Sequence, residues 1–461
     1  MKFKANWAWV DGAWAANVLL ESDAQGFWTR IQPNATPAET SGAEPLGCVV
    51  PGLVNAHSHA FQRAIAGLTE YSSHSGDDFW SWRDRMYQVA LRVGPDHLEA
   101  IATWLYSEML QSGYTHVCEF HYLHRNPDGQ NYADAAEMTW ALVRAAEKVG
   151  IGLTMLPTLY MNQGFGQSGL NAMQRRFAST PESILEIQQS VIQHASANGQ
   201  QACLNSGVAI HSLRAVAQAE ILDLTSSSGA APVHIHVAEQ TKEVADCVGH
   251  TGLRPVEWLL ANAKMDARWN LVHATHTSHE EIKGIQAHQA SVVLCPTTEA
   301  NLGDGFFDLP EALLQKMQWS IGTDSHVNRN WTEELRLLEY GCRLSLRKRN
   351  VSLLHQNGLG STGQVLFENA VQGGSKAAGL PLTGIALGQR ADLVEIDLTS
   401  NALLGITIER LLDAMIFSTP SFEVRNVFVA GKKRTQQNME WKSSFLKTML
   451  EVQTFQKPSA V

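Results

Sequence analysis

Short apolar runs alternate with amphipathic segments through the middle of the chain. The amphipathic segments carry their apolar residues at roughly helical spacing. Eight apolar runs occupy residues 47–56, 115–120, 151–159, 207–212, 233–239, 270–275, 291–297 and 320–325. Apolar strands that alternate with helices are typical of a parallel sheet covered on both faces. Eight such units predict an α/β fold, a (β/α)₈ barrel with long loops.

Two of the intervening segments carry clear helix signals. Residues 96–113 have a helical apolar pattern that ends at Gly113, a residue favoured just beyond a helix. Residues 180–195 follow the same pattern and begin at Thr180, a favourable N-cap. We expect both segments to cover the barrel strands.

The two ends of the chain have a different pattern. The first twenty residues alternate about an Asp11-Gly12 turn, and residues 384–398 and 425–434 are strand-like with glycine turns. We therefore expect a small β-sandwich assembled from both termini. The predicted division is residues 1–50 for its first part, 51–377 for the barrel, and 378–461 for its second part plus a terminal helix.

Polar residues gather at the C-terminal ends of the apolar runs. In an α/β barrel these ends converge at one mouth, where active sites are built. Residues distant in sequence are therefore expected to meet there. They include His57, His59, Tyr122, His211, His236, Glu239, His273 and Asp324.

Several of these residues are of the types that bind a metal ion. His57 and His59 point to one side of an extended backbone, and His236 and Asp324 end other runs. Three imidazoles and one carboxylate suit Zn²⁺ with a position left for water. His234, one step deeper on the same strand, is the alternative to His236, but we expect it to be a packed, hydrogen-bonded histidine.

Glu239 follows His236 in an H-x-x-E pattern. A carboxyl group at this place can move protons between a water molecule and a leaving nitrogen. The alternative is a glutamate that merely stabilises the start of a helix. His273 and Asp324 are expected to orient the attacking water or accept its proton, which makes Glu239, His273 and Asp324 the candidate catalytic residues.

These motifs together resemble those of the amidohydrolase superfamily: an HSH after the first strand, two further histidines, and TDS at 323–325. Members of the superfamily bind a divalent metal on this fold. The mononuclear deaminases are the nearest branch, because Ala209–Ser212 lacks the lysine of the binuclear members. The resemblance thus implies one zinc per subunit.

Within that branch the chain is most similar to the formimidoylglutamate deiminases, chiefly through residues 57–70, 79–87, 236–240, 296–310 and 322–350. The resemblance implies zinc-dependent hydrolysis of N-formimidoyl-L-glutamate to N-formyl-L-glutamate and ammonia, in histidine degradation, by a homodimer. It also implies that this small dicarboxylate substrate contacts Gln62, Arg83, Tyr122, His211 and Arg214.

Charge and composition narrow the alternatives. The chain has 461 residues and a net charge of −10, so nucleic acid and anionic membranes are not expected partners. Six scattered cysteines and the lack of an apolar leader favour a cytoplasmic protein.

Two other functions stay open from the sequence: a zinc deaminase of an aminated heteroaromatic ring, and a non-catalytic barrel that serves as a scaffold.

Overall fold

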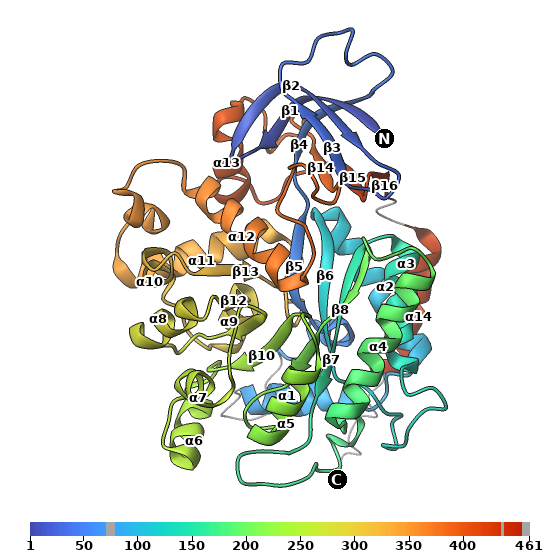
Figure 1. The fold of residues 1–461 in the computed structure, drawn as a ribbon, viewed down its shortest axis with the longest axis vertical. Helices are drawn as coiled ribbons and strands as arrows, with labels where there is room; N and C mark the ends of the chain where they lie inside the picture. The colour runs from blue at the N-terminus through green and yellow to red at the C-terminus, as the bar shows by residue number, and fades with distance from the viewer. Residues whose placement is uncertain (71–78, 435–437, 454–461) are drawn as a thin grey trace.

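The computed structural model describes residues 1–70, 79–434 and 438–453 and confirms the predicted barrel (Figure 1). The barrel strands pair in parallel, and a bridge between Ser58 and Asp324 joins the last strand end to the first. The strands are β5 (Leu53–Ser58), β6 (Tyr114–His121), β7 (Gly152–Leu159), β8 (Leu204–Ser206), β9 (Val208–Ile210), β10 (Val233–Val237), β11 (Trp269–His273), β12 (Ser291–Leu294) and β13 (Gln318–Ile321).

Several of the eight apolar runs differ from the strands that they predicted, and the last one, 320–325, is a strand only through Ile321. The run 47–56 contains the end of one strand and the start of another, because the chain crosses at Pro51-Gly52 from the end sheet to the barrel. The run 291–297 ends as a strand at Leu294, since Pro296 starts a helix. Apolar character alone does not reveal these breaks.

Helices cover the outside of the barrel, and most belong to the crossovers between its strands. The α-helices are α1 (Phe79–Ala90), α2 (Pro95–Gln111), α3 (Glu137–Val149), α4 (Pro181–Ala197), α5 (Gln218–Ser227), α6 (Thr241–Thr251), α7 (Pro255–Asn262), α8 (His279–Ala287), α9 (Pro296–Leu302), α10 (Leu309–Leu314), α11 (Trp331–Leu346), α12 (Thr362–Ala378), α13 (Leu411–Phe417) and α14 (Met439–Gln453). The 3₁₀ turns are η1 (Ala60–Ile65), η2 (Arg175–Phe177), η3 (Val351–Gln356) and η4 (Ile408–Arg410).

The two predicted helix signals are found close to their expected places. Thr180 caps α4, and its side chain accepts a hydrogen bond from the Ser183 N–H. Helix α2 ends at Gln111 with Ser112 as its C-cap, and Gly113 follows in the left-handed region at φ 90°. The glycine therefore lies just beyond the helix end, where a Cβ is unfavourable.

Both termini contribute to the sheet at the top of Figure 1. Its order is β16-β15-β14-β4-β1-β2-β3, one continuous sheet that is antiparallel except between β1 and β4. The strands are β1 (Lys2–Val10), β2 (Ala13–Ser22), β3 (Trp28–Gln32), β4 (Glu44–Val50), β14 (Leu393–Ile396), β15 (Val424–Val429) and β16 (Lys432–Lys433). The β1–β2 turn has Asp11 and Gly12 at positive φ, as a type I′ turn requires.

The terminal helix α14 packs on the barrel rather than on the end sheet. Phe445 stacks on Trp104 of α2, and the Gln453 side chain donates to the carbonyl of Ala64 in η1. The C-terminal segment therefore contributes to both parts of the molecule. The division at residues 50 and 377 stays a prediction.

Gly373 marks the tightest approach of α12 to the barrel. A Cβ at this position would lie 1.8 Å from the carbonyl oxygen of Trp319 in β13. We expect Gly373→Ala to lower the free energy of unfolding by about 1–3 kcal/mol, because the backbones must move apart. Gly249→Ala in α6 is the matched control: its Cβ would meet nothing within 4 Å, so the propensity gain of alanine should leave stability equal or higher. Equal denaturation midpoints for wild type and Gly373→Ala would contradict the predicted close packing.

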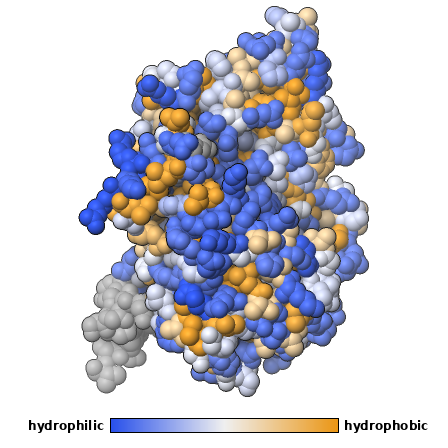
Figure 2. Space-filling view, turned by 60° about the vertical axis from the view of Figure 1, so that its left-hand side comes forward, coloured by the Kyte–Doolittle hydropathy of each residue, from blue (hydrophilic) through white to orange (hydrophobic). Residues whose placement is uncertain are grey.

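Hydrophilic residues cover much of the face that carries α10 and α11, with apolar residues interspersed (Figure 2). Exposed leucines in this part of the chain include Leu314, Leu344 and Leu359. Among the helices in the described ranges, none is both long and apolar enough to span a lipid bilayer.

Candidate metal and active site

Four predicted metal ligands meet at the barrel mouth. His57 lies in β5, His59 follows that strand, His236 lies in β10, and Asp324 follows β13. The four side chains are buried, and one ligand atom from each lies within 4.8 Å of all the others. His234 is elsewhere, because its Nε2 donates to the carbonyl of Ala377 at 2.9 Å. His234 therefore lies outside this cluster.

The separations of the ligand atoms suit a small tetrahedral cation. His57 Nε2 lies 3.1 Å from His59 Nε2, 3.0 Å from His236 Nε2 and 3.3 Å from Asp324 Oδ1. Bonds of about 2.0–2.1 Å to a tetrahedral zinc place neighbouring ligand atoms about 3.3 Å apart. Hydrogen bonding alone does not explain the cluster. His57 Nε2 carries at most one hydrogen, so it can donate to only one of its three neighbours, and the other two stay close without a hydrogen bond to it.

The surroundings present the imidazoles in the form that binds metal. The Nδ1 atoms of His59 and His236 donate to the carbonyls of Phe120 and His211, at 2.8 and 3.0 Å, which leaves each Nε2 lone pair directed at the cluster. Within the described chain His57 Nδ1 has no such partner. Burial lowers the pKa of His57 to about 3, so this ring is neutral.

Backbone contacts hold the first and last barrel strands in register at the site. The Asp324 N–H donates to the His57 carbonyl at 3.0 Å, and the His59 N–H donates to the Asp324 carbonyl at 3.2 Å. Ala238, His273 and Asp324 all have positive φ, between 46° and 67°. Such conformations are uncommon outside glycine, and their clustering indicates that strained turns orient the site residues.

A second group of ionisable side chains surrounds His273. Its Nδ1 lies 3.2 Å from Glu299, and its Nε2 lies 3.7 Å from Glu239 and 3.9 Å from Asp324. Burial alone would lower the pKa of His273, but the carboxylates of Glu239, Asp324 and Glu299 outweigh it and raise the pKa to about 10. A protonated His273 donates hydrogen bonds, so the site favours it as a donor rather than as the proton acceptor that the sequence left open.

Glu239 itself has a second carboxyl neighbour that the sequence did not single out. Asp304, Glu239 and His273 approach within 4.8 Å of one another, and Gln240 donates to Asp304. Burial, chiefly, raises the pKa of Glu239 to about 7 and that of Asp304 to about 9. The pair therefore holds at least one proton near neutral pH, as a group that exchanges protons requires.

A small cavity opens directly onto these two groups. It is lined by ten of the predicted site residues, with His57 lying beneath, and by aromatic and apolar side chains. The ten are His59, Gln62, Arg83, Tyr122, His211, Arg214, His236, Glu239, His273 and Asp324. The structure thus brings together all the residues that the sequence analysis proposed for the site.

The polar walls of the cavity contain donors and acceptors that are still available. Gln62 donates to Tyr122 Oη at 3.0 Å, whereas its own Oε1 is buried and has no partner in the described chain. The His211 ring lies tilted against Tyr160 and edge-on to Tyr122, and burial lowers its pKa well below the usual value. A substrate N–H could therefore be bound by Gln62 Oε1.

Two arginines bring positive charge to the same cavity. Arg83 comes from α1 and Arg214 from the loop after β9. Among the residues that the structure describes, neither guanidinium forms an ion pair with a carboxylate, and Arg83 Nε is buried without a hydrogen-bond partner. Two guanidinium groups without carboxylate partners, facing one small cavity, are suited to an anionic ligand.

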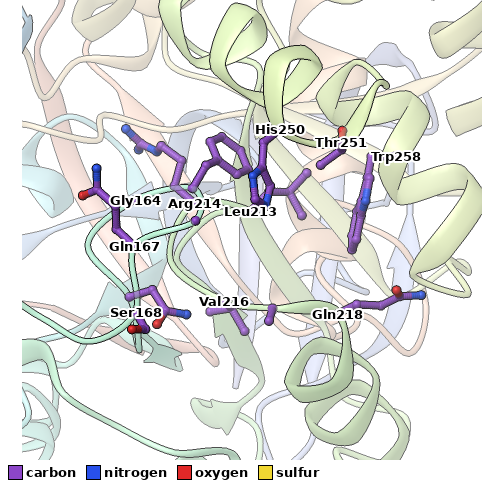
Figure 3. A pocket seen from close by; sticks show the side chains of 14 residues that line it. Gly164, Gln167, Ser168, Leu213, Arg214, Val216, Gln218, His250, Thr251 and Trp258 are labelled. Carbon is purple, nitrogen blue, oxygen red and sulfur yellow. The ribbon is translucent and has the colours of Figure 1, made fainter.

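Arg214 also borders a second, outer hollow of about 360 Å³ (Figure 3). This hollow lies between the loops after β7 and β9 and helices α6 and α7, and Gln167, His250 and Trp258 are among its lining residues. Arg214 therefore forms part of the wall that separates the inner cavity from this outer hollow.

Comparisons with known proteins show the family of the chain. The amidohydrolase family matches residues 48–434. A formimidoylglutamate deiminase of Pseudomonas aeruginosa is 44% identical over 91% of each chain. The crystal structure of an amidohydrolase from Brucella melitensis has a TM-score of 0.90 and 41% identity, covering 98% of this chain and 100% of that one. An atrazine chlorohydrolase from Arthrobacter aurescens, crystallised with zinc, shares the fold at a TM-score of 0.82 but only 17% identity, covering 98% of this chain and 99% of that one.

Proposed function

Because the chain belongs to the amidohydrolase family and is a hydrolase acting on carbon–nitrogen bonds, we propose that it deiminates N-formimidoyl-L-glutamate. The products are N-formyl-L-glutamate and ammonia. The observation that carries the proposal is the pair of guanidinium groups, Arg83 and Arg214, that share one cavity with Glu239 and the metal-type cluster. One arginine is available for each carboxylate of the substrate.

We further propose that the cluster holds one zinc ion per subunit. His57, His59, His236 and Asp324 would be its ligands, and their nitrogen-rich donor set and spacing fit zinc better than calcium or magnesium. Zinc held by these residues would lower the pKa of water towards about 7 and would so supply a nucleophile at neutral pH.

The side chains around the cavity then perform the remaining steps. Arg83 and Arg214 bind the carboxylates and place the formimidoyl carbon beside the cluster. Glu239 takes a proton from the attacking water and delivers it to the terminal nitrogen of the protonated formimidoyl group. The carbon–nitrogen bond then breaks, ammonia leaves, and the hydroxyl group on the former formimidoyl carbon loses its proton to become the formyl oxygen. The protonated His273 donates a hydrogen bond to the oxygen that gains negative charge, and Gln62 Oε1 accepts from a substrate N–H.

The competing function is deamination of an aminated heteroaromatic ring. Such a substrate does not need two guanidinium groups, so the two arginines favour the dicarboxylate. Ammonia release from N-formimidoyl-L-glutamate, guanine and a triazine, measured on protein of known metal content, tests the choice. We expect turnover with N-formimidoyl-L-glutamate alone, and turnover with a ring substrate alone would refute the proposal. Family membership argues against a purely structural scaffold.

Removing one arginine should weaken substrate binding more than it slows the reaction. We expect Arg83→Met to raise KM about 10- to 100-fold, the loss of one charge-assisted carboxylate contact, with a smaller change in kcat. Arg85→Met is the matched control on the same helix, because its Nη1 donates to the Leu68 carbonyl and it does not line the cavity. Steady-state kinetics check this, and an unchanged KM in Arg83→Met would remove that residue from the binding site.

Three further features belong to the proposal. A homodimer and a role in histidine degradation follow from the family resemblance, and a cytoplasmic location follows from the six scattered cysteines. Light scattering at several protein concentrations tests the homodimer, and a monomeric mass throughout would contradict it.

A further inference from the structure

One tryptophan ring lies against both of the cavity's guanidinium groups. The Cζ atom of Arg83 is 4.4 Å from the centre of the Trp80 ring, and that of Arg214 is 5.6 Å from it. Arg83 follows Trp80 by one helical turn of α1, whereas Arg214 reaches the ring from the distant loop after β9. The two guanidinium carbons are therefore at most about 10 Å apart, with Trp80 as their shared support.

Both arginines contact the ring at cation–π distance and also line the cavity. A guanidinium that packs its face on an aromatic ring keeps its N–H groups in its own plane, where a carboxylate binds them bidentately. Arg83 and Arg214 line the cavity, whereas Trp80 is not among the residues that line it. Trp80 would thus act on a ligand through the two arginines and not by direct contact.

The ring also offsets an electrostatic cost. Two cations held close together repel each other, and burial near the cavity weakens the screening by water. The negative face of an indole attracts a cation at each of these positions. Lys242 of α6 approaches the same ring at 5.8 Å, but its ammonium is paired with Asp246 at 2.7 Å and is exposed. Of these three cations, which belong to the described part of the chain, Arg83 and Arg214 combine contact with the ring and access to the cavity.

We propose that Trp80 is a positioning residue that fixes the separation of the Arg83 and Arg214 guanidinium groups and so selects the length of the dicarboxylate. The inference rests on the proposed function, because it assigns one arginine to each carboxylate. Both carboxylates of a glutamate derivative are separated by three carbons, as in glutarate, and those of an aspartate derivative by two, as in succinate. The site should therefore favour five-carbon diacids.

Calorimetric titration with glutarate and succinate tests this without requiring turnover. We expect the wild-type protein to bind glutarate about tenfold more tightly than succinate. Trp80→Leu should reduce that ratio to about twofold or less, since the arginines then adopt several separations. Trp80→Phe, which keeps an aromatic face, should retain most of the preference. Trp140→Leu on α3, a tryptophan remote from the cavity, is the control for a general loss of stability.

The outcomes separate the inference from the proposed function. An unchanged glutarate-to-succinate ratio in Trp80→Leu, or no preference in the wild type, overturns the role of Trp80. If Trp80→Leu does not fold, Trp80→Phe and Trp80→Tyr replace it in the test. Loss of the glutarate-to-succinate preference in these variants, which keep an aromatic face, also overturns the role of Trp80. A wild type that prefers glutarate, with the ratio lost in Trp80→Leu, but releases no ammonia from N-formimidoyl-L-glutamate refutes the proposed function and leaves the inference standing.

Discussion

Replacing Glu239 by glutamine is expected to lower kcat by about 10²–10⁴-fold while the bound metal is retained. The amide occupies the same space but cannot take a proton from water and deliver it to the leaving nitrogen. Glu239 is not one of the four clustered ligands, so its loss leaves that cluster intact. Its pKa of about 7, raised mainly by burial, matches a group that both accepts and donates a proton near neutral pH.

Asp246→Asn is the matched control for this variant. It removes a carboxylate from α6, the helix that follows Glu239, where Asp246 pairs with the exposed Lys242. We expect its kcat to stay within about twofold of the wild type, because an exposed pair contributes little. Metal analysis and initial rates check both variants. If Glu239→Gln kept more than about a tenth of the wild-type kcat, Glu239 would have no part in proton transfer.

The second large effect is expected on strand β10, where two buried histidines lie two residues apart. His236→Gln should lose the metal on dialysis and lower kcat/KM by about a thousandfold or more, because one of the four ligands is removed. His234→Gln should keep the metal, since His234 bonds to the Ala377 carbonyl away from the cluster. Any effect of His234→Gln should be on stability.

Measured metal content distinguishes these two histidines. Zinc is determined after dialysis against a weak chelator, and thermal unfolding shows whether each variant is folded. Loss of zinc in His234→Gln with retention in His236→Gln would reverse the assignment of the ligands. Equal retention in both folded variants would place the metal elsewhere.

The barrel could be predicted from the sequence because its strands are apolar throughout and its polar residues fall at their ends. Parallel strands bring those ends together, so His57, His236 and Asp324 were expected to meet although they are far apart along the chain. The end sheet could also be predicted, because the alternation of apolar and polar residues and the glycine turns are local signals in the sequence. The packing of α14 on α2 could not be predicted, because it depends on tertiary contacts such as that of Phe445 with Trp104.

The contacts of the site that the sequence did not reveal depend on tertiary packing. Glu299 was among the polar residues expected near the end of the run 291–297, but its contact with His273 was not foreseen, because the strand stops at Leu294 and Glu299 lies on α9. Asp304 lies in a glycine-rich segment that resembles an ordinary turn, and only the folded chain brings it beside Glu239. Trp80 belongs to a motif with other aromatic residues, and its contact with Arg214 joins α1 to a loop more than a hundred residues later. The pattern of apolar and polar residues along the chain does not predict such contacts.

The identity of the products formed from N-formimidoyl-L-glutamate tests the central claim most directly. Zinc-loaded protein is incubated with substrate labelled with ¹³C at the formimidoyl carbon, and the mixture is followed by NMR with a parallel ammonia assay. The account predicts that the label appears in N-formyl-L-glutamate with one ammonia released for each molecule converted. Formation of labelled formamide with free L-glutamate, or no reaction in protein that holds one zinc per chain, would contradict it.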